Sequence, residues 1–147
     1  MTEPTLANQL CFSLYRANHA MSRLFRPLLL QFDLTYPQYL MLLALWQQDG
    51  VKLKTLAQQT ELEAATVTPI LKRLEGKGLL ERRSDPDDER AKLAYLTVAG
   101  HHLKAPLFAA REQLYQRIAP NGEPDHITEL RLELDRLSAS LERLTQS

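Results

Sequence analysis

Apolar residues in the first part of the chain recur at steps of three and four positions. From Leu6 to about Gln31 they form a single apolar stripe, which predicts one long amphipathic helix. Thr35 and Gln38 then stand in the spacing of a capping box, and a proline follows in the first turn. A second helix is therefore expected from about Tyr36 to Gln47.

The segment after Leu53 contains two short helical patterns with a break near Glu61, where many helix-turn-helix motifs have glycine. Pro69 complicates the second pattern, because proline inside a helix removes a hydrogen bond and clashes with the preceding turn. The sequence therefore leaves two possible starts for the recognition helix. It begins either near Ala64 or, as a shorter helix capped by Thr68, at Pro69. The packing positions of a helix-turn-helix would be Leu56, Ala57, Leu62, Val67 and Ile70.

A β-hairpin is expected directly after this motif. Leu79–Ser84 and Lys92–Leu96 have the composition of strands, and the polar sequence DPDDE between them suits a turn. In this position the hairpin is a wing, and Arg90 near its tip is the type of side chain that enters the minor groove of DNA. Four acidic residues crowd this arginine, so we expect at least one of them, most simply Asp88, to pair with a basic side chain and stabilise the tip. The alternative is a solvated turn without function.

Two further helices are predicted after the hairpin. Thr97 is expected to cap a helix that reaches about Ile118, and PNGEPD (residues 120–125) to form a loop. The last helix repeats apolar residues in a heptad-like seam, which requires a partner surface. Since a small winged domain offers few internal surfaces, we expect a homodimer whose recognition helices contact two half-sites of a pseudo-palindromic double-stranded DNA operator. The seam consists of Ile127, Leu130, Leu134, Leu137, Leu141 and Leu144.

These elements define a mainly α fold with a small β-hairpin. We expect one domain over residues 1–147, in which a winged helix-turn-helix at about residues 35–97 is flanked by dimerisation helices at about residues 1–34 and 98–147. The 18 basic residues balance 18 acidic ones, so attraction to DNA depends on their placement. Residues 52–83 hold seven basic and four acidic residues, which is a favourable placement.

Other features of the composition exclude several classes of protein. A single cysteine rules out an internal disulfide framework, and the start of the chain lacks a secretion leader. The longest apolar run, Tyr39–Trp46, is much shorter than the ~20 residues that cross a bilayer. The four histidines lack the spacing of a metal site, and no glycine-rich phosphate loop is present. We therefore expect a cytoplasmic protein without membrane contact, metal or cofactor.

The winged motif, the sequence DPDDERAKLAYLT and the flanking helices resemble the MarR family of transcriptional regulators over nearly the whole chain. NQLCFSLY, RPLL, LTYPQYL and TPILKRLE resemble its organic-hydroperoxide-sensing branch, the OhrR-type repressors. This resemblance implies that Cys11 is the peroxide sensor, that Tyr36 hydrogen-bonds its sulfur across the dimer interface, and that Tyr15 matches another tyrosine of the family. Phe25 stands where the branch has a further tyrosine, so one expected hydroxyl is missing.

The chemistry expected of Cys11 is oxidation to sulfenic acid. A phenol that donates a hydrogen bond favours the thiolate, and the thiolate is the nucleophile that attacks the peroxide O–O bond. Apolar neighbours such as Leu10 and Phe12 favour organic hydroperoxides. Because no second cysteine exists in the chain, the sulfenic acid would be captured by a small cellular thiol, by a backbone nitrogen, or by a cysteine in another subunit. Oxidation would then release a repressor from its operator.

Two alternatives keep Cys11 out of the sensing role or change the class of protein. In the first, Cys11 is a buried structural residue, and the repressor responds to a small apolar or phenolic ligand. In the second, the chain is a one-cysteine thiol peroxidase. Only Arg16 lies close to Cys11 in sequence as a potential activator, which favours a stoichiometric sensor over an enzyme.

The expected DNA contacts come from the recognition helix and the wing. In the wing they are Arg90 and the neighbouring Asp88. The family branch has a serine- and glycine-containing start to this helix, whereas Ala64 and Ala65 can offer only apolar contact to thymine methyls. Some basic residues will contact phosphate alone and so position the helix. The expected contact residues of the recognition helix are Thr66, Thr68, Lys72 and Arg73.

Overall fold

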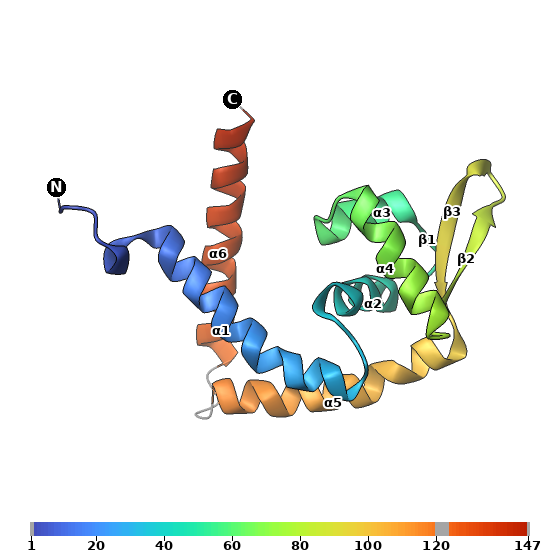
Figure 1. Ribbon diagram of the computed structural model, residues 1–147, viewed down its shortest axis with the longest axis horizontal. Helices are drawn as coiled ribbons and strands as arrows, with labels where there is room; N and C mark the ends of the chain where they lie inside the picture. Colours follow the sequence, from blue (N-terminus) through green and yellow to red (C-terminus); the bar gives the residue numbers. More distant parts are fainter. Residues whose placement is uncertain (1, 120–123, 147) are drawn as a thin grey trace. The chain divides into compact units, whose positions relative to one another are not determined.

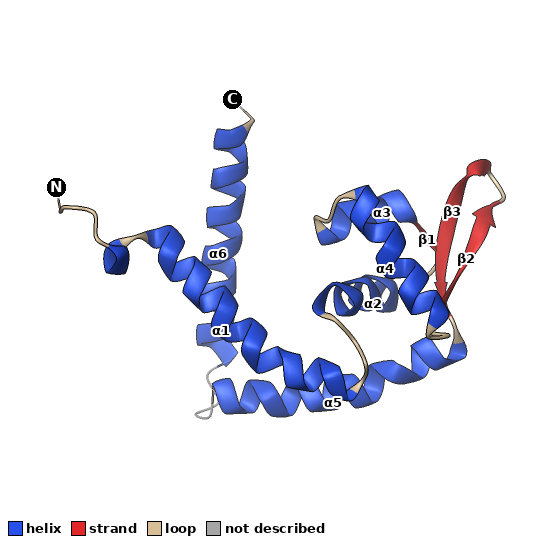
Figure 2. Ribbon diagram, viewed as in Figure 1, coloured by secondary structure: helices blue, strands red, loops and turns tan. Residues whose placement is uncertain are grey.

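The computed structural model describes residues 2–119 and 124–146 (Figure 1). By its internal contacts the chain divides into two compact units, Met1–Leu107 and Phe108–Ser147. Helices dominate the described residues, with one small sheet in the first unit (Figure 2). The mainly α fold class that the sequence predicts is confirmed, whereas the single domain over residues 1–147 stays a prediction.

The first helix begins later than the sequence predicts. Helix α1 covers Leu10–Gln31, and Leu6–Asn8 form a separate 3-10 turn, η1. Gln9 between them has an extended backbone with φ −85° and ψ 126°. The N–H of Thr5 donates to Asn8 Oδ1 at 2.9 Å, and the N–H of Asn8 donates to the Thr5 carbonyl at 3.2 Å, so the 3-10 turn is closed by its own residues. This local capping interaction overrides the apolar periodicity, which continues through Gln9 without interruption.

Helix α2 covers Tyr36–Gln47, as predicted. The N–H of Gln38 donates to Thr35 Oγ1 at 3.4 Å, and the N–H of Thr35 donates to Gln38 Oε1 at 3.2 Å, which completes the capping box. Asp33 adopts the left-handed conformation (φ 54°) and turns the chain between the two helices. Tyr39 is buried in the core, and Trp46 donates its indole N–H to the Gly100 carbonyl at 2.9 Å.

The helix-turn-helix consists of α3 (Leu53–Thr60) and α4 (Ala64–Gly76). Glu61 between them is left-handed with φ 57°, a conformation that glycine adopts more easily. Pro69 lies inside α4, so the longer recognition helix is right and the start capped by Thr68 is wrong. Burial explains this outcome, since Val67, Leu71 and Leu74 on one face of α4 are almost completely inaccessible to solvent and hold the helix across the proline.

The wing is part of a three-stranded antiparallel sheet. Strand β2 covers Leu80–Asp85 and β3 covers Asp88–Leu96, so the expected hairpin is present with a shorter turn than predicted. A further strand, β1 at Val51–Lys52, pairs with β3 and gives the order β1-β3-β2. Its two residues carry no sequence pattern that predicts a strand. Figure 1 shows the hairpin projecting beside α3 and α4.

The second half of the chain contains two long helices. Helix α5 covers Val98–Ile118, and Thr97 Oγ1 accepts a hydrogen bond from the N–H of Gly100 at 3.1 Å, which confirms the predicted cap. Helix α6 covers Pro124–Thr145, so the last two residues of the predicted loop are helical. Residues 120–123 of that loop lie outside the described part of the chain. In the described residues, no helix is both long and apolar enough to span a membrane.

Candidate functional site

The outward face of α4 presents polar side chains to solvent. Helical geometry places Val67 and Leu71 toward the core, and leaves Thr66, Lys72 and Arg73 exposed, with Thr68 half-buried at the margin. All four predicted contact residues of this helix are therefore near its accessible face. A helix with one buried edge and one exposed basic face is suited to enter the major groove of DNA.

Pro69 lies on the same exposed face of α4. Because proline has no N–H, it cannot supply the hydrogen bond that the Ala65 carbonyl would accept in a regular α-helix. Ala65 is exposed as well, so the middle of this face is small and apolar between the threonines and the basic residues. This surface can contact thymine methyl groups, as the sequence suggested.

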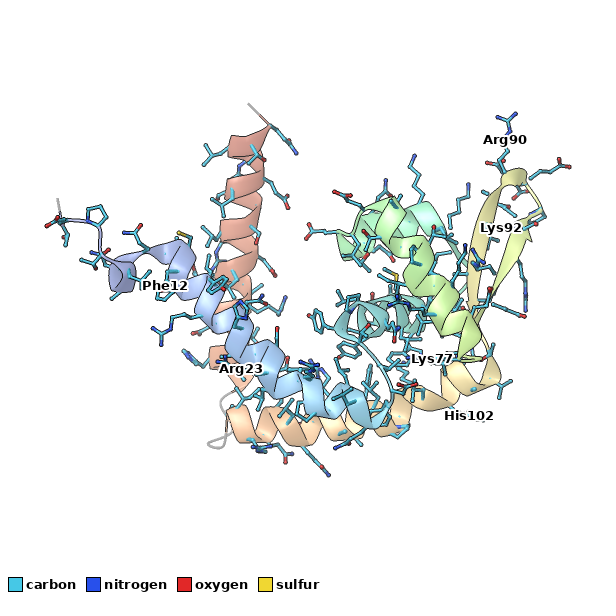
Figure 3. The ribbon with its side chains drawn as sticks, in the orientation of Figure 1. Phe12, Arg23, Lys77, Arg90, Lys92 and His102 are labelled. Carbon is cyan, nitrogen blue, oxygen red and sulfur yellow. The ribbon has the colours of Figure 1, made fainter. Side chains whose placement is uncertain are left out.

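The tip of the wing carries Arg90, whose side chain points away from the hairpin (Figure 3). Asp88 accepts a hydrogen bond from the backbone N–H of Arg90 at 3.0 Å. Among the described residues Asp88 makes no ion pair, so the choice of Asp88 as the acid that pairs with a basic side chain is wrong for the free chain. Its carboxylate is used in the local turn, because that N–H is only two residues away.

Among the acidic residues of the turn, the expectation of an ion pair is met by Asp85. Its carboxylate lies 3.7 Å from Lys52 Nζ of β1 and accepts a hydrogen bond from the N–H of Asp87 at 2.9 Å. The Asp85 side chain is only 6% exposed. The sequence favoured Asp88 over Asp85, since the partner of Asp85 belongs to a strand that local patterns do not reveal.

A second ion pair connects α4 to β2. Glu75 accepts hydrogen bonds from the backbone N–H and the guanidinium of Arg82 at 3.2–3.3 Å. The side-chain hydrogen bond from Arg82 lowers the pKa of Glu75 below its ordinary value of 4.5, and the charges of Arg82 and Lys72 act in the same direction. The recognition helix is therefore attached to the wing by a charged hydrogen bond near its C-terminal end.

Cys11 is exposed in the first turn of α1. Tyr15 one turn later is 61% exposed and stacks on Phe12, with a distance of 6.4 Å between ring centroids. The rings of His19 and Tyr15 meet edge-on, with a distance of 4.3 Å between their centroids. The expectation that Cys11 is a buried structural residue therefore does not hold for the single chain, and its sulfur is accessible next to an aromatic surface.

Tyr36 is the first residue of α2 and is 54% exposed. Within the described part of the chain it makes no hydrogen bond to Cys11, so a contact between the two requires a second chain, as the family resemblance implies. Phe25 is buried on the inner side of α1. Its buried ring has no hydroxyl at the position where the branch has a tyrosine.

Both terminal helices leave large apolar side chains exposed. Those of η1 and α1 are Leu6, Leu10, Tyr15, Met21 and Leu30, and those of α6 are Leu130, Leu132, Leu134, Leu141 and Leu144. Leu130, Leu134, Leu141 and Leu144 belong to the predicted seam, which a single chain leaves largely uncovered. Exposed apolar surface of this extent is typical of a protein–protein interface. Among the described residues, no group of three or more His, Cys, Asp or Glu side chains could hold a metal ion.

The helix-turn-helix, its exposed polar helix and the arginine-tipped hairpin define a winged helix-turn-helix protein. Residues 34–92 match the model of the MarR family. The organic hydroperoxide resistance transcriptional regulator of Bacillus subtilis is 44% identical over 99 residues, which are 67% of this chain and 67% of that protein. The chain belongs to the MarR family of transcriptional regulators.

Two further comparisons agree with this assignment. The transcriptional regulator TtmR of Methylorubrum extorquens is 45% identical over 103 residues, which cover 70% of this chain and about half (53%) of TtmR. Reduced AbfR bound to DNA has a similar structure, with a TM-score of 0.78 and 32% identity. The similarity covers 95% of this chain and 94% of AbfR, a protein of Staphylococcus epidermidis. The OhrR-type branch that the sequence indicated is supported by the relative from B. subtilis.

Proposed function

We propose that the chain is a homodimeric transcriptional repressor that releases its operator when an organic hydroperoxide oxidises Cys11. One observation carries the proposal: the single cysteine is exposed one turn before Tyr15, in a chain 44% identical to an organic hydroperoxide resistance regulator. Tyr36 of a second chain would donate a hydrogen bond to the Cys11 thiolate and favour that form. Tyr15 would border the same site from within α1.

The reaction is a two-electron oxidation of sulfur. The Cys11 thiolate attacks one peroxide oxygen, an S–O bond forms as the O–O bond breaks, and the alkoxide that leaves takes up a proton to become an alcohol. Cys11 becomes a sulfenic acid. A small thiol can then condense with it to give a mixed disulfide and water, and the added bulk would disturb the α1 surface.

DNA binding is proposed for α4 and the wing. Thr66, Thr68, Lys72 and Arg73 would lie in the major groove, and Arg90 would reach the adjacent minor groove, with Asp88 fixing the backbone beside it. The DNA complex of AbfR, which is 32% identical, supports DNA as the partner. Two copies joined through the terminal helices would present two recognition helices to a pseudo-palindromic operator.

The test uses an operator duplex selected by the reduced protein from random sequences. Wild type and Cys11→Ser are each titrated with DNA before and after one equivalent of an organic hydroperoxide, and the intact mass is recorded. We expect oxidation to weaken DNA binding by wild type and to add oxygen to it, while Cys11→Ser stays bound and unmodified. Since Cys11 is the single cysteine, it is the one thiol to which the added oxygen can be assigned.

The outcomes separate the proposal from its alternatives. If wild type gains oxygen at Cys11 and remains bound with unchanged affinity, peroxide sensing is wrong. A small ligand that releases wild type and Cys11→Ser alike would identify a ligand-responsive repressor. Repeated peroxide turnover with a thiol reductant, without affinity for any duplex, would identify the peroxidase.

A further inference from the structure

Lys77 extends from the end of the recognition helix to the turn between α1 and α2. It is the C-cap residue of α4, directly after Gly76, and Figure 3 shows it at that end of the helix. Its ammonium group donates to the backbone carbonyl of Asp33 and, at 3.0 Å, to Gln38 Oε1. These partners lie 44 and 39 residues earlier in the chain.

The acceptor in this contact is a buried part of the α2 cap. Gln38 is 3% exposed, and the same oxygen that receives Lys77 also accepts the N–H of Thr35 at 3.2 Å. The Asp33 carboxylate lies 3.6 Å from Lys77 Nζ but is 91% exposed, so this ion pair adds little. The hydrogen bond to buried Gln38 is therefore the specific part of the contact.

Tyr36 is located inside this cap. Thr35 is the N-cap of α2 and Gln38 is the third residue of the helix, so Tyr36 lies between the two members of the capping box. A displacement of Tyr36 would move Thr35 or Gln38, and both are joined through Gln38 Oε1 to Lys77. The C-terminal end of α4 would then be displaced, since Lys77 directly follows the last residue of this helix.

We propose that Lys77 is a positioning residue that couples the N-terminal cap of α2 to the recognition helix α4. The proposal deepens the proposed function, because there Tyr36 is the residue that responds to the state of Cys11. The hydrogen bond from Lys77 to Gln38 joins the cap of α2 to the end of α4. A positive charge at a helix C-terminus also stabilises the helix by itself, so coupling must be measured apart from stability.

The experiment is a double-mutant cycle on operator affinity in the reduced protein. Thr35→Ala removes the hydroxyl that accepts the Gln38 N–H, and Lys77→Met removes the ammonium donors while keeping the length of the side chain. We expect Thr35→Ala to weaken operator binding about fivefold or more with Lys77 present and less than about twofold in the Lys77→Met background. Lys77→Arg and Thr35→Ser are the matched controls and should restore the wild-type pattern.

Equal effects of Thr35→Ala in both backgrounds would overturn the proposal, because a merely structural lysine gives additive losses. The proposal would also be overturned if Thr35→Ala, in the protein that retains Lys77, left the operator affinity unchanged. All variants are compared at a temperature where circular dichroism shows each to be folded, and Gln38→Met replaces Thr35→Ala if the latter is unfolded. The double-mutant cycle on operator affinity is then carried out with Gln38→Met and Lys77→Met.

A second arm separates this proposal from peroxide sensing. Oxidation at Cys11 should weaken operator binding by wild type much more than by Lys77→Met, although both gain the same mass. If oxidised wild type stays bound while the cycle is non-additive, the sensing role of Cys11 fails and the coupling through Lys77 stands. If oxidation releases wild type and Lys77→Met to the same extent, the coupling proposal fails and the sensor remains.

Discussion

Lys52 Nζ lies 3.7 Å from the carboxylate of Asp85, and this ion pair joins the two-residue strand β1 to the end of β2. Asp85 is buried, and it also accepts the N–H of Asp87 in the turn that follows. One carboxylate thus fixes both the turn of the wing and its attachment to β1, the strand directly before α3.

Replacement of Asp85 should destabilise the protein more than replacement of its exposed partner. Asp85→Ala leaves the Asp87 N–H without its acceptor, and we expect the free energy of unfolding to fall by about 1 to 3 kcal/mol. Lys52→Met should cost less than about 1 kcal/mol, because Lys52 is largely exposed. Asp88→Ala in the same turn is the matched control. Urea unfolding measures all three, and an Asp85→Ala value equal to that of Asp88→Ala would refute the role of Asp85.

Gly50 is required by both its backbone and its surroundings. Its φ is +68°, and an added Cβ would lie 2.6 Å from Cε1 of Tyr95. Gly50→Ala should therefore lower the free energy of unfolding by about 1 to 3 kcal/mol. Gly76→Ala is the contrast, since nothing lies within 4 Å of its added Cβ in helix α4, and it should raise stability by about 0.5 to 1 kcal/mol. Melting temperatures that move in the same direction for both variants would contradict this prediction.

Pro69 is expected to reduce the stability of α4. In the variant Pro69→Ala the residue gains an N–H for the Ala65 carbonyl and loses the ring that crowds the preceding turn. The free energy of unfolding should rise by about 1 to 3 kcal/mol. The measurement is chemical denaturation, with Ala64→Ser at the start of the helix as a control of small effect. A less stable Pro69→Ala would mean that the ring packs against neighbours more than the structure indicates.

The pair between Glu75 and Arg82 should make stability depend on pH in the acidic range. Since the folded-state pKa of Glu75 is lowered from 4.5, its contribution is fully present above about pH 4.5 and is lost as the pH falls through the lower folded-state value. In Glu75→Gln this part of the pH dependence should disappear. Unfolding curves of both proteins between about pH 3 and 7 test the prediction, and parallel pH profiles would contradict it.

Arg90 should contribute to DNA affinity without supporting the fold. Arg90→Ala is expected to weaken operator binding by about 1 to 3 kcal/mol and to leave the melting temperature unchanged, because the side chain projects from the tip of the wing (Figure 3). Arg143→Ala in α6 removes an equal charge outside the winged motif and should have little effect on DNA binding. Fluorescence anisotropy at several salt concentrations measures both, and equal losses would indicate an effect of net charge alone.

The sequence by itself determined the elements whose hydrogen bonds are local. Thr35 and Gln38 cap α2 across three residues, and Thr97 caps α5 across the same separation, so both helix starts could be predicted from the chain. Apolar spacing placed Leu56, Ala57 and Val67 in the core of the helix-turn-helix. The family resemblance, and not any local rule, supplied the roles proposed for Cys11, Tyr15 and Tyr36.

Contacts between distant segments decided the rest. Strand β1 exists because Val51 pairs with Ala94, and α4 continues through Pro69 because its other face is buried. Asp85 rather than Asp88 is the acidic residue of the wing turn that forms an ion pair, since Lys52 of β1 lies beside it. Lys77 contacts Asp33 and Gln38 across about forty residues. Such partners are brought together only when the core forms, because no periodicity or cap along the chain relates residues at that separation.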